Sequence, residues 1–389
     1  MQGIDTALRE AAAGAVVPGV AAAAADSRGL LYEGAFGRRS LSADAPVTAD
    51  SVFWIASMTK ALTAAAAMQL VEQGRLQLDA PISAVLPELS RVQVLEGFAG
   101  DGAPQLRPPR RPISLRHLLS HTSGFGYAFC NTRLNQYVEK LGVPDIMGCS
   151  NAALRVPLLF DPGEQWEYGT GIDWAGKAVE ALSGMDIEAY LAKHLLEPLG
   201  MRSTAFTLSP ALRDRMATMH VRGPDGTLTP IGFEMPQQPE FKMGGGGVYS
   251  TAGDYLRFLR MLLNEGKLDG NRVLRAETVR LMRQNQVGGL QAGAIKTAMP
   301  QYSNDFDFYP GMPQRWGLSF LINMEQSPQG RNAGSLAWAG LSNSYYWFDP
   351  QADVCGVILM QILPFADAGA LELFNRFEEG VYRHRTETA

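Results

Sequence analysis

The segment 61–71 constrains the fold of this chain more than any other stretch. Its residues, Ala-Leu-Thr-Ala-Ala-Ala-Ala-Met-Gln-Leu-Val, are apolar nearly all round. A helix of this kind has no face suited to water, so it is predicted to lie inside a protein core. Gly74 follows it as a C-terminal stop. Such a helix needs layers of other elements around it, and a chain of 389 residues is long enough to supply them.

Strand patterns occur at both ends of the chain, and helical patterns lie between them. Near the N-terminus, residues 20–26 and 30–36 flank the turn Ser27-Arg28-Gly29, which predicts a β-hairpin. Toward the C-terminus, short apolar runs separated by turns predict an antiparallel meander followed by a closing helix; these segments are 316–324, 334–338, 344–348, 354–362 and the helix 366–384. The pattern predicts an α+β fold, in which one antiparallel sheet is flanked by helices and carries a large, mainly helical insertion.

The same pattern predicts how the chain divides into domains. We expect a discontinuous α/β sheet domain formed by residues 1–60 and 310–389, with a mainly helical domain of residues 61–309 inserted into it. An active site is expected at the interface of the two. An irregular stretch follows the predicted helix 276–284 and runs to about residue 315. It is predicted to shape substrate access, because loops of this kind often carry binding residues.

A serine and a lysine three residues apart stand at the mouth of the apolar helix. They belong to Ser57-Met58-Thr59-Lys60, the only S-x-x-K sequence in the chain. Residues i and i+3 share one face of a helix, so the lysine amine can reach the serine hydroxyl. Serine is a weak nucleophile unless a neighbour takes its proton, and lysine can do so only when neutral. Burial and the positive end of the helix dipole both lower a lysine pKa. We therefore predict that Ser57 is a nucleophile and Lys60 its base.

Two other residues were considered as partners of this pair. Tyr168 lies just before a predicted helix that begins near Asp173, and a phenol near a lysine can act as an acid or a base. It could equally be a buried tyrosine with a satisfied hydroxyl, and the residues alone leave both readings open. His121 could serve as the base of a serine, but no Asp or Glu lies nearby in sequence and Gly124 indicates a capping turn. A structural role is therefore expected for His121.

Composition excludes several classes of partner. The net charge is −5, the isoelectric point is near 5.7, and no basic run occurs, which argues against nucleic-acid binding. The odd number of cysteines without C-x-x-C spacing indicates neither a disulfide framework nor a zinc site; they are predicted to be buried thiols at Cys130, Cys149 and Cys355. Neither a metal nor a cofactor is expected.

Two further segments, one glycine-rich and one apolar, do not match the functional motifs that they resemble at first sight. The run Gly244–Gly247 is not a phosphate-binding loop, because no G-K-[ST] follows it, and a tight backbone passage close to the core is predicted. The apolar stretch Ala15–Ala25 is interrupted by Pro18-Gly19 and is shorter than the roughly 20 residues of a membrane span. No signal-like N-terminal pattern is present, so a cytoplasmic protein without a membrane partner is expected.

Three motifs, taken together, resemble those of the serine β-lactamase-like superfamily. Ser57-Met58-Thr59-Lys60, Tyr168-Gly169-Thr170 and Trp338-Ala339-Gly340 occur in the order and approximate spacing of that superfamily's elements. The tyrosine in the second motif makes the chain similar to the class C branch and to the family VIII carboxylesterases. Longer stretches resemble the fungal acyltransferases that attach the side chain in lovastatin biosynthesis, at residues 94–98, 115–124 and 161–180. The resemblance covers about residues 5–384.

The resemblance implies a β-lactamase-like, penicillin-binding-protein-like fold and a role for each motif residue. Ser57 would be the acylated nucleophile, Lys60 its proton acceptor, and Tyr168 the group that protonates the leaving group and later activates water or an alcohol. The backbone N–H groups of Ser57 and Leu341 would form the oxyanion hole. Substrate contacts would come from the residues that follow these motifs or line the cleft, namely Phe125, Tyr127, Thr170, Trp338 and Gly340.

Two departures from the superfamily pattern indicate the kind of substrate. β-Lactamases and peptidases carry a cation, usually lysine, where this chain has Trp338, and an asparagine where it has Thr170. A tryptophan cannot pair with a substrate carboxylate, and the loss of such a charged hydrogen bond costs about 1.5–3 kcal/mol. The main hypothesis is therefore a serine hydrolase acting on neutral, short- to medium-chain carboxylic esters, with acyl transfer to alcohols as a second outcome.

Other hypotheses use the same residues. A dedicated acyltransferase of the lovastatin type is the nearest alternative, because hydrolysis and transfer share one acyl-enzyme and differ in what attacks it. A β-lactamase or penicillin-binding protein is the second alternative. A non-catalytic ligand-sensing module is disfavoured by the intact set Ser57, Lys60 and Tyr168. The expected partners are a small ester and, for transfer, an alcohol acceptor. The sequence leaves the oligomeric state open.

Overall fold

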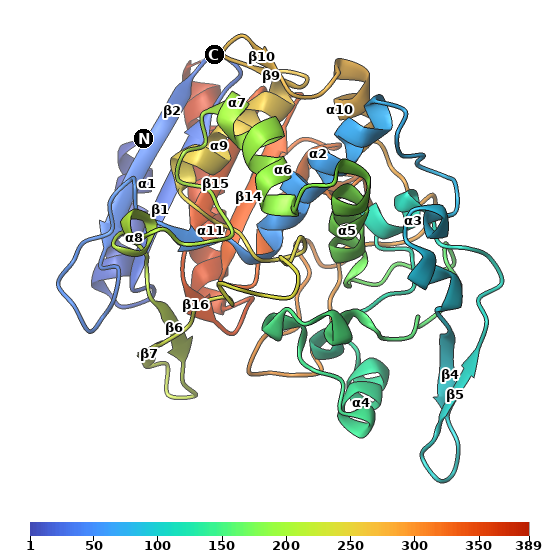
Figure 1. The fold of residues 1–389 in the computed structure, drawn as a ribbon. Helices are drawn as coiled ribbons and strands as arrows, with labels where there is room; N and C mark the ends of the chain where they lie inside the picture. Colours follow the sequence, from blue (N-terminus) through green and yellow to red (C-terminus); the bar gives the residue numbers. More distant parts are fainter. Residues whose placement is uncertain (389) are drawn as a thin grey trace.

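A seven-stranded antiparallel sheet joins the two ends of the chain in the computed structural model, which describes residues 1–388 (Figure 1). The strand order is β11-β12-β13-β14-β15-β1-β2. The strands are β1 (Gly19–Ala25), β2 (Leu30–Gly37), β11 (Gln314–Trp316), β12 (Leu321–Asn323), β13 (Leu336–Gly340), β14 (Ser344–Asp349) and β15 (Val354–Leu359). Strand β1 pairs with β15, with Ala23 opposite Val357. The predicted hairpin, the meander and the single sheet built from both termini are confirmed.

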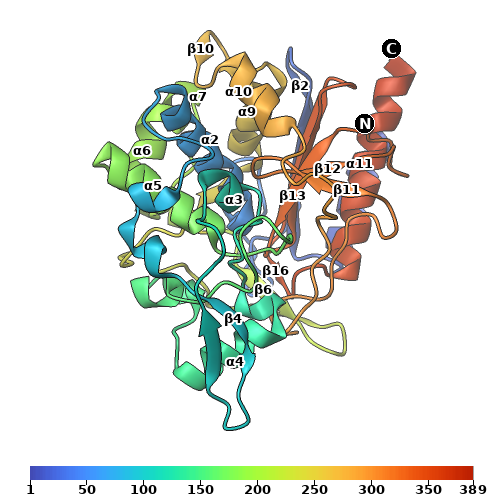
Figure 2. The same ribbon diagram turned by 90° about the vertical axis from the view of Figure 1, so that its right-hand side faces the viewer.

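Helices cover both faces of this sheet (Figure 2). The first and last helices, α1 (Gln2–Ala13) and α11 (Ala368–Thr388), pack against each other on one face. Aromatic side chains of α11 meet those of β14: Phe374 stacks on Tyr345 with ring centroids 4.8 Å apart. On the opposite face, α9 (Ala252–Leu263) contacts β1, β14 and β15. The sheet is therefore the middle layer of three.

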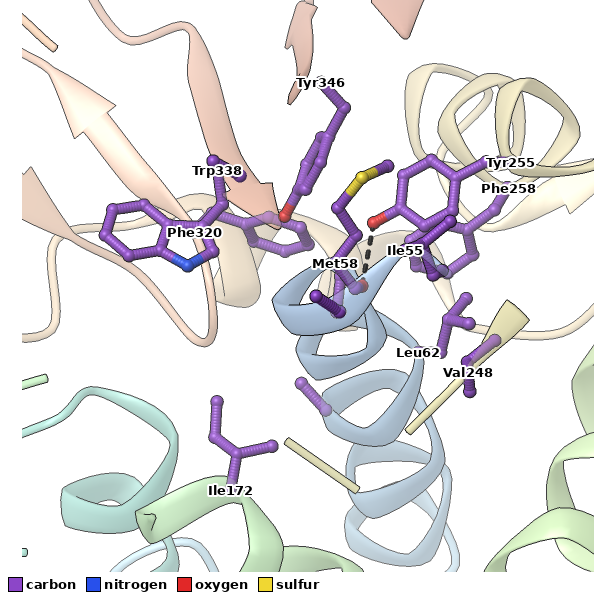
Figure 3. Packing of buried hydrophobic residues seen from close by; sticks show 14 of the residues in the cluster. Ile55, Met58, Leu62, Ile172, Val248, Tyr255, Phe258, Phe320, Trp338 and Tyr346 are labelled. Carbon is purple, nitrogen blue, oxygen red and sulfur yellow. Dashed lines mark hydrogen bonds between the residues drawn. The ribbon is translucent and has the colours of Figure 1, made fainter. Parts of the chain in front are cut away.

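Helix α2 (Thr59–Glu72) lies in the core, as its apolar sequence predicts. Every residue from Thr59 to Leu70 is buried. It packs against α5 (Gly171–Ser183), α6 (Ile187–Leu191) and the π-helical continuation η7 (Ala192–Leu196). Figure 3 shows Met58, at the start of this helix, between Tyr255 of α9 and the sheet residues Trp338 and Tyr346. The Tyr255 hydroxyl donates a 3.0 Å hydrogen bond to the Met58 carbonyl. The start of α2 is therefore fixed against the sheet layer.

The remaining elements are short and mostly lie between α2 and the C-terminal strands in sequence. The helices are α3 (Leu115–Leu119), α4 (Thr132–Leu141), α7 (Glu197–Leu199), α8 (Pro210–Arg213) and α10 (Ala276–Arg283), with single turns η1 (Ala56–Met58), η2 (Ile82–Ala84), η3 (Pro87–Arg91), η4 (Ala128–Cys130), η5 (Ile146–Gly148) and η6 (Asn151–Leu154). The strands pair as β3 (Phe53–Trp54) with β8 (Tyr249–Ser250), β4 (Val94–Phe98) with β5 (Pro104–Arg107), β9 (Lys267–Leu268) with β10 (Asn271–Arg272), and β6 (Met219–Arg222) with both β7 (Leu228–Ile231) and β16 (Ile362–Leu363).

One local prediction differs from the structure, and two elements were not predicted from the sequence. The Gly-, Pro- and Arg-rich stretch near residues 90–110 contains the hairpin β4–β5, which Arg107 links to the buried carboxylate of Asp161 by hydrogen bonds of 2.7 and 3.0 Å. Helix α4 was not predicted either; its apolar residues Leu134, Tyr137, Val138 and Leu141 recur at helical spacing, but only Leu134 is buried. The predicted strand 316–324 is two strands, because the chain turns between them at Ser319, whose φ is +78°.

The predicted division at residues 60 and 310 stays a prediction. Helix α9 falls within the predicted insertion, yet it covers the sheet.

None of the helices in residues 1–388 combines the length and apolar character that a membrane crossing requires. The prediction of buried thiols is confirmed, since all three cysteines are buried and free.

Candidate active site

A sharp turn presents Ser57 at the entrance to α2. Strand β3 leads into the turn η1, where Ala56 has a φ of +44°, in a region that non-glycine residues rarely adopt. The Thr59 hydroxyl holds this turn by donating a 2.6 Å hydrogen bond to the Ala56 carbonyl, and it accepts a 3.1 Å bond from the Val248 N–H. Ser57 is partly exposed while its neighbours are buried. The turn therefore offers one hydroxyl to a ligand.

Lys60 lies behind this hydroxyl and is 1% exposed. Its Nζ is 3.0 Å from the Ser57 Oγ, 3.1 Å from the Tyr127 hydroxyl and 2.6 Å from the Gly245 carbonyl oxygen. A neutral amine has two N–H donors and one lone pair. A carbonyl oxygen can only accept a hydrogen bond, so one N–H of Lys60 must point at Gly245. A second N–H fits Tyr127, which leaves the lone pair facing the serine hydroxyl.

Burial makes the neutral form of this lysine accessible near neutral pH. Burial lowers the pKa of Lys60 to about 7, against the opposing effect of the nearby Asp173 carboxylate. The predicted pKa direction is thus supported, and desolvation is the leading cause. Burial also raises the pKa of Asp173, with Lys60 opposing that shift. Each charge therefore offsets part of the pKa shift that burial causes in the other group.

Asp173 connects the lysine to the glycine run. One carboxylate oxygen accepts a 2.7 Å hydrogen bond from the Gly245 N–H, and the other lies 3.5 Å from the Tyr127 hydroxyl. A Cβ on Gly245 would stand 2.6 Å from this carboxylate. The Thr63 hydroxyl donates a 2.7 Å bond to the Gly244 carbonyl. The prediction of a tight backbone passage close to the core is confirmed.

Tyr168 lies on the other side of Lys60. The Lys60 Nζ is 4.6 Å from the centre of its ring, and its hydroxyl accepts a 3.1 Å hydrogen bond from the Trp338 indole N–H. Burial raises the pKa of Tyr168 above its usual value, while the Ser57 hydroxyl and Trp338 N–H oppose this. The phenol is therefore protonated at neutral pH. Tyr168 stands where a proton can pass between it, Ser57 and Lys60.

The pocket above Ser57 is mainly apolar. Its lining residues come from the η4 turn, the irregular stretch before β11, strand β13 and the chain after it; they are Ser57, Phe129, Tyr168, Ile295, Ser303, Trp338, Ala339, Gly340, Leu341 and Phe365. No Asp, Glu, Lys or Arg lines it among the described residues. A Cβ on Gly340 would be 2.3 Å from the Ile55 carbonyl oxygen, so β13 passes directly against the turn that carries Ser57. Ser57 and Leu341 border the same pocket.

The structure brings together most of the predicted site residues. Ser57, Lys60, Tyr168, Trp338 and the Gly340-Leu341 pair converge on this pocket. Thr170 and Tyr127 line an adjoining groove, whose wall includes helix α4 and which shares Phe129 with the pocket. Tyr127 does more than line a surface, because it contacts Lys60.

Phe125 lies elsewhere. Its ring stacks on Trp174 at 6.0 Å and lines a separate cavity of about 760 Å³ beside Arg91, Arg155 and Lys177. The chain folds back at Gly124, with a φ of +92°, and this directs Phe125 away from Ser57. Its assignment as a substrate contact in the Ser57 pocket is not supported by this position.

Three contributors were missed from the sequence. Asp173 could have been found from one signal, since it is a carboxylate among the apolar residues of the first helical turn, and a buried carboxylate is unusual. The signal for Gly245 was its place in a glycine run. Phe129 had no such signal, because nothing in its local sequence indicates that it lines a pocket.

Comparison with known proteins gives consistent results. A family model described as beta-lactamase matches residues 4–379. The chain is 34% identical to monacolin J acid methylbutanoyltransferase of Aspergillus terreus, with 97% of this chain and 95% of that protein covered. It is 30% identical to a lovastatin esterase of Penicillium rubens, with 98% of each covered. Among solved structures, a mutant of simvastatin synthase from Aspergillus terreus superposes with a TM-score of 0.86 at 33% identity, covering 99% of this chain and 95% of that one.

Proposed function

Because this chain belongs to the β-lactamase family, we propose that it acts on carboxylic esters through an acyl-enzyme at Ser57. The acyl group passes from the ester to the serine, and then to water or to an alcohol. The observation that carries the proposal is the position of the Lys60 Nζ, 3.0 Å from the Ser57 Oγ, with Tyr127 and Gly245 in reach as partners for the two N–H groups of the neutral amine.

Acylation begins when the Lys60 lone pair accepts the Ser57 proton as the Oγ attacks the ester carbonyl carbon. The negative charge that develops on the carbonyl oxygen is stabilised by the backbone N–H groups of Ser57 and Leu341, each worth about 3–4 kcal/mol in comparable sites. Tyr168 donates its proton to the departing alkoxide and regains one from Lys60. The products of this half-reaction are a free alcohol and an ester of Ser57.

Deacylation reverses these roles. Water or an alcohol passes its proton to Tyr168 as it attacks the acyl carbonyl, while Tyr168 passes its own proton to Lys60. When the second tetrahedral intermediate collapses, Lys60 returns that proton to the Ser57 Oγ. Water yields a carboxylic acid, and an alcohol yields a new ester. The same residues serve both outcomes, so the relative access of water and alcohol decides between them.

The apolar pocket supports neutral esters over β-lactams. Trp338 stands where a β-lactamase carries the cation that binds the substrate carboxylate, and its N–H is already bonded to Tyr168. The pocket has no Lys or Arg among its described lining residues. Burying an unpaired substrate carboxylate there would carry a large desolvation cost.

A dedicated acyltransferase is the second candidate. The relatives named above include both a methylbutanoyltransferase and an esterase at similar identity, so sequence similarity supports either. The groove beside Tyr127 and Thr170 gives an alcohol acceptor an approach to the site. The proposed substrates are esters of short- to medium-chain acids, with an alcohol as acceptor. The proposed location is the cytoplasm, which cell fractionation can test.

The test uses p-nitrophenyl esters of increasing acyl length together with nitrocefin. Turnover of the esters by the wild type, none by Ser57→Ala, and formation of a new ester when a small alcohol is added are expected. Transfer product exceeding free acid at modest alcohol concentration would select the acyltransferase. Nitrocefin turnover above ester turnover, or full ester turnover by Ser57→Ala, would refute the proposal.

A further inference from the structure

His121 lies against the catalytic tyrosine but takes no part in the mechanism above. Its ring is 1% exposed and is enclosed by aromatic rings, with centroids 4.8 Å from Tyr168, 5.1 Å from Trp316 and 6.1 Å from Trp166. No hydrogen bond joins it to Ser57 within residues 1–388, and Lys60 already occupies the position of the base. A buried imidazole of this kind needs another explanation.

His121 contacts the chain on both sides of Tyr168. Its backbone carbonyl accepts a 2.9 Å hydrogen bond from the Glu167 N–H, and its Nδ1 accepts a longer one, 3.4 Å, from the Gly169 N–H. The Tyr168 carbonyl in turn accepts a 3.2 Å bond from the Tyr127 N–H. These three bonds bracket the peptide units from which the Tyr168 side chain projects.

The backbone of Phe125 lies close against Gly169. A Cβ on Gly169 would stand 2.1 Å from the Phe125 carbonyl oxygen, so the chain is pressed against that backbone. The Gly169 N–H can then reach only the imidazole among the side chains described. The Phe125 backbone therefore leaves this peptide little room on one side, and the hydrogen bond to the His121 Nδ1 holds its N–H.

The donor fixes the protonation state of the ring. Because Gly169 donates its N–H, the Nδ1 must carry a lone pair, and a neutral imidazole then carries its proton on Nε2. Burial and the charge of Lys60 hold the pKa of His121 well below its usual value. The ring is therefore neutral, and its Nδ1 an acceptor, at neutral pH.

We propose that His121 is a positioning residue, whose Nδ1 holds the Gly169 N–H and thereby aims the Tyr168 hydroxyl at Ser57 and at the leaving group. The proposal rests on the proposed function, in which Tyr168 delivers a proton to the departing alkoxide. A displacement of a reacting group by about 1 Å can cost about 100-fold in rate.

Three substitutions separate acceptor position from ring packing. His121→Asn places an amide oxygen near the Nδ1 position, and asparagine tolerates the φ of +57° found here. His121→Gln puts its oxygen near Nε2 instead, and His121→Leu removes the acceptor. Circular dichroism and thermal melting establish that each variant is folded before its kinetics are measured.

The readout is kcat/KM for two esters of one acid, ethyl butyrate and p-nitrophenyl butyrate. An ethoxide leaving group needs a proton from Tyr168, whereas p-nitrophenolate leaves as a stable anion. In His121→Gln and His121→Leu, kcat/KM should fall about 10- to 100-fold for the ethyl ester and much less for the aryl ester. His121→Asn should retain activity within about threefold of the wild type on both.

A general structural role would lower both esters equally in every folded variant, and that outcome would overturn the proposal. Equal loss in the Asn and Gln variants would also overturn it, because the imidazole itself would then be required. Failure of the underlying function is distinguishable, since it would appear in the wild type as absence of ester turnover, or in Ser57→Ala as retained turnover.

Discussion

The tryptophan at position 338 offers the sharpest test of how this site works. Trp338→Phe removes the indole N–H that donates to the Tyr168 hydroxyl at 3.1 Å. A phenylalanine keeps an aromatic ring in the cluster formed with Trp316 and Phe308, whose centroids are 4.6 and 6.2 Å from Trp338. The substitution therefore isolates one hydrogen bond.

The size of the effect follows from the charge that Tyr168 carries during reaction. The indole N–H opposes the rise in the pKa of Tyr168, so its removal raises that pKa further and makes the phenol a weaker acid. A hydrogen bond to a charged group contributes about 1.5–3 kcal/mol. If that stabilisation is felt only as the phenol loses its proton, kcat should fall about 10- to 150-fold with little change in KM.

The assay is steady-state hydrolysis of ethyl butyrate from pH 5 to 10, with Trp316→Phe as the matched control. That substitution also removes a buried indole N–H from the cluster, but its partner is the Leu119 carbonyl at 3.2 Å. The control should lose stability, by about 1 kcal/mol, while keeping most of its kcat. Comparable kcat values for Trp338→Phe and the wild type, with both proteins folded, would falsify the role given to Trp338.

Three further outcomes are expected. Asp173→Asn removes a charge that raises the pKa of Lys60, so that pKa should drop below about 7 and the acid limb of the kcat/KM profile should move to lower pH. Gly340→Ala should lower the free energy of unfolding by about 1–3 kcal/mol in urea melts, because its Cβ would stand 2.3 Å from a backbone carbonyl oxygen. Arg331→Met should cost about 3–5 kcal/mol, since it leaves the Glu378 carboxylate buried without its 3.0 Å partner.

Each of these has its own control. An unshifted or alkaline-shifted acid limb in Asp173→Asn would contradict the charge argument. Gly253→Ala, where the nearest atom to a new Cβ is 3.9 Å away, should be neutral or gain about 0.4–1 kcal/mol. The double variant Arg331→Met with Glu378→Met should recover most of the lost stability, and no recovery would show that packing rather than charge was at fault.

Local periodicity determined the main elements of the fold. The apolar run at 61–71 predicts a core helix because no face of it suits water, and short apolar runs separated by turns at the two ends predict a sheet that joins them. Helix α4 and the hairpin β4–β5 were not predicted. Helix α4 has apolar residues at helical spacing but buries only Leu134, and tertiary contacts such as the Arg107–Asp161 ion pair stabilise the hairpin.

Within the site, the sequence by itself determined the pair Ser57 and Lys60, because residues three apart in one turn must meet. It did not determine what surrounds them. Lys60 bonds to Tyr127 across 67 positions and to Gly245 across 185, and Trp338 bonds to Tyr168 across 170. Only tertiary structure brings such residues together, since contacts at that separation depend on how the layers pack. That packing also desolvates the lysine, and a pKa near 7 is its consequence.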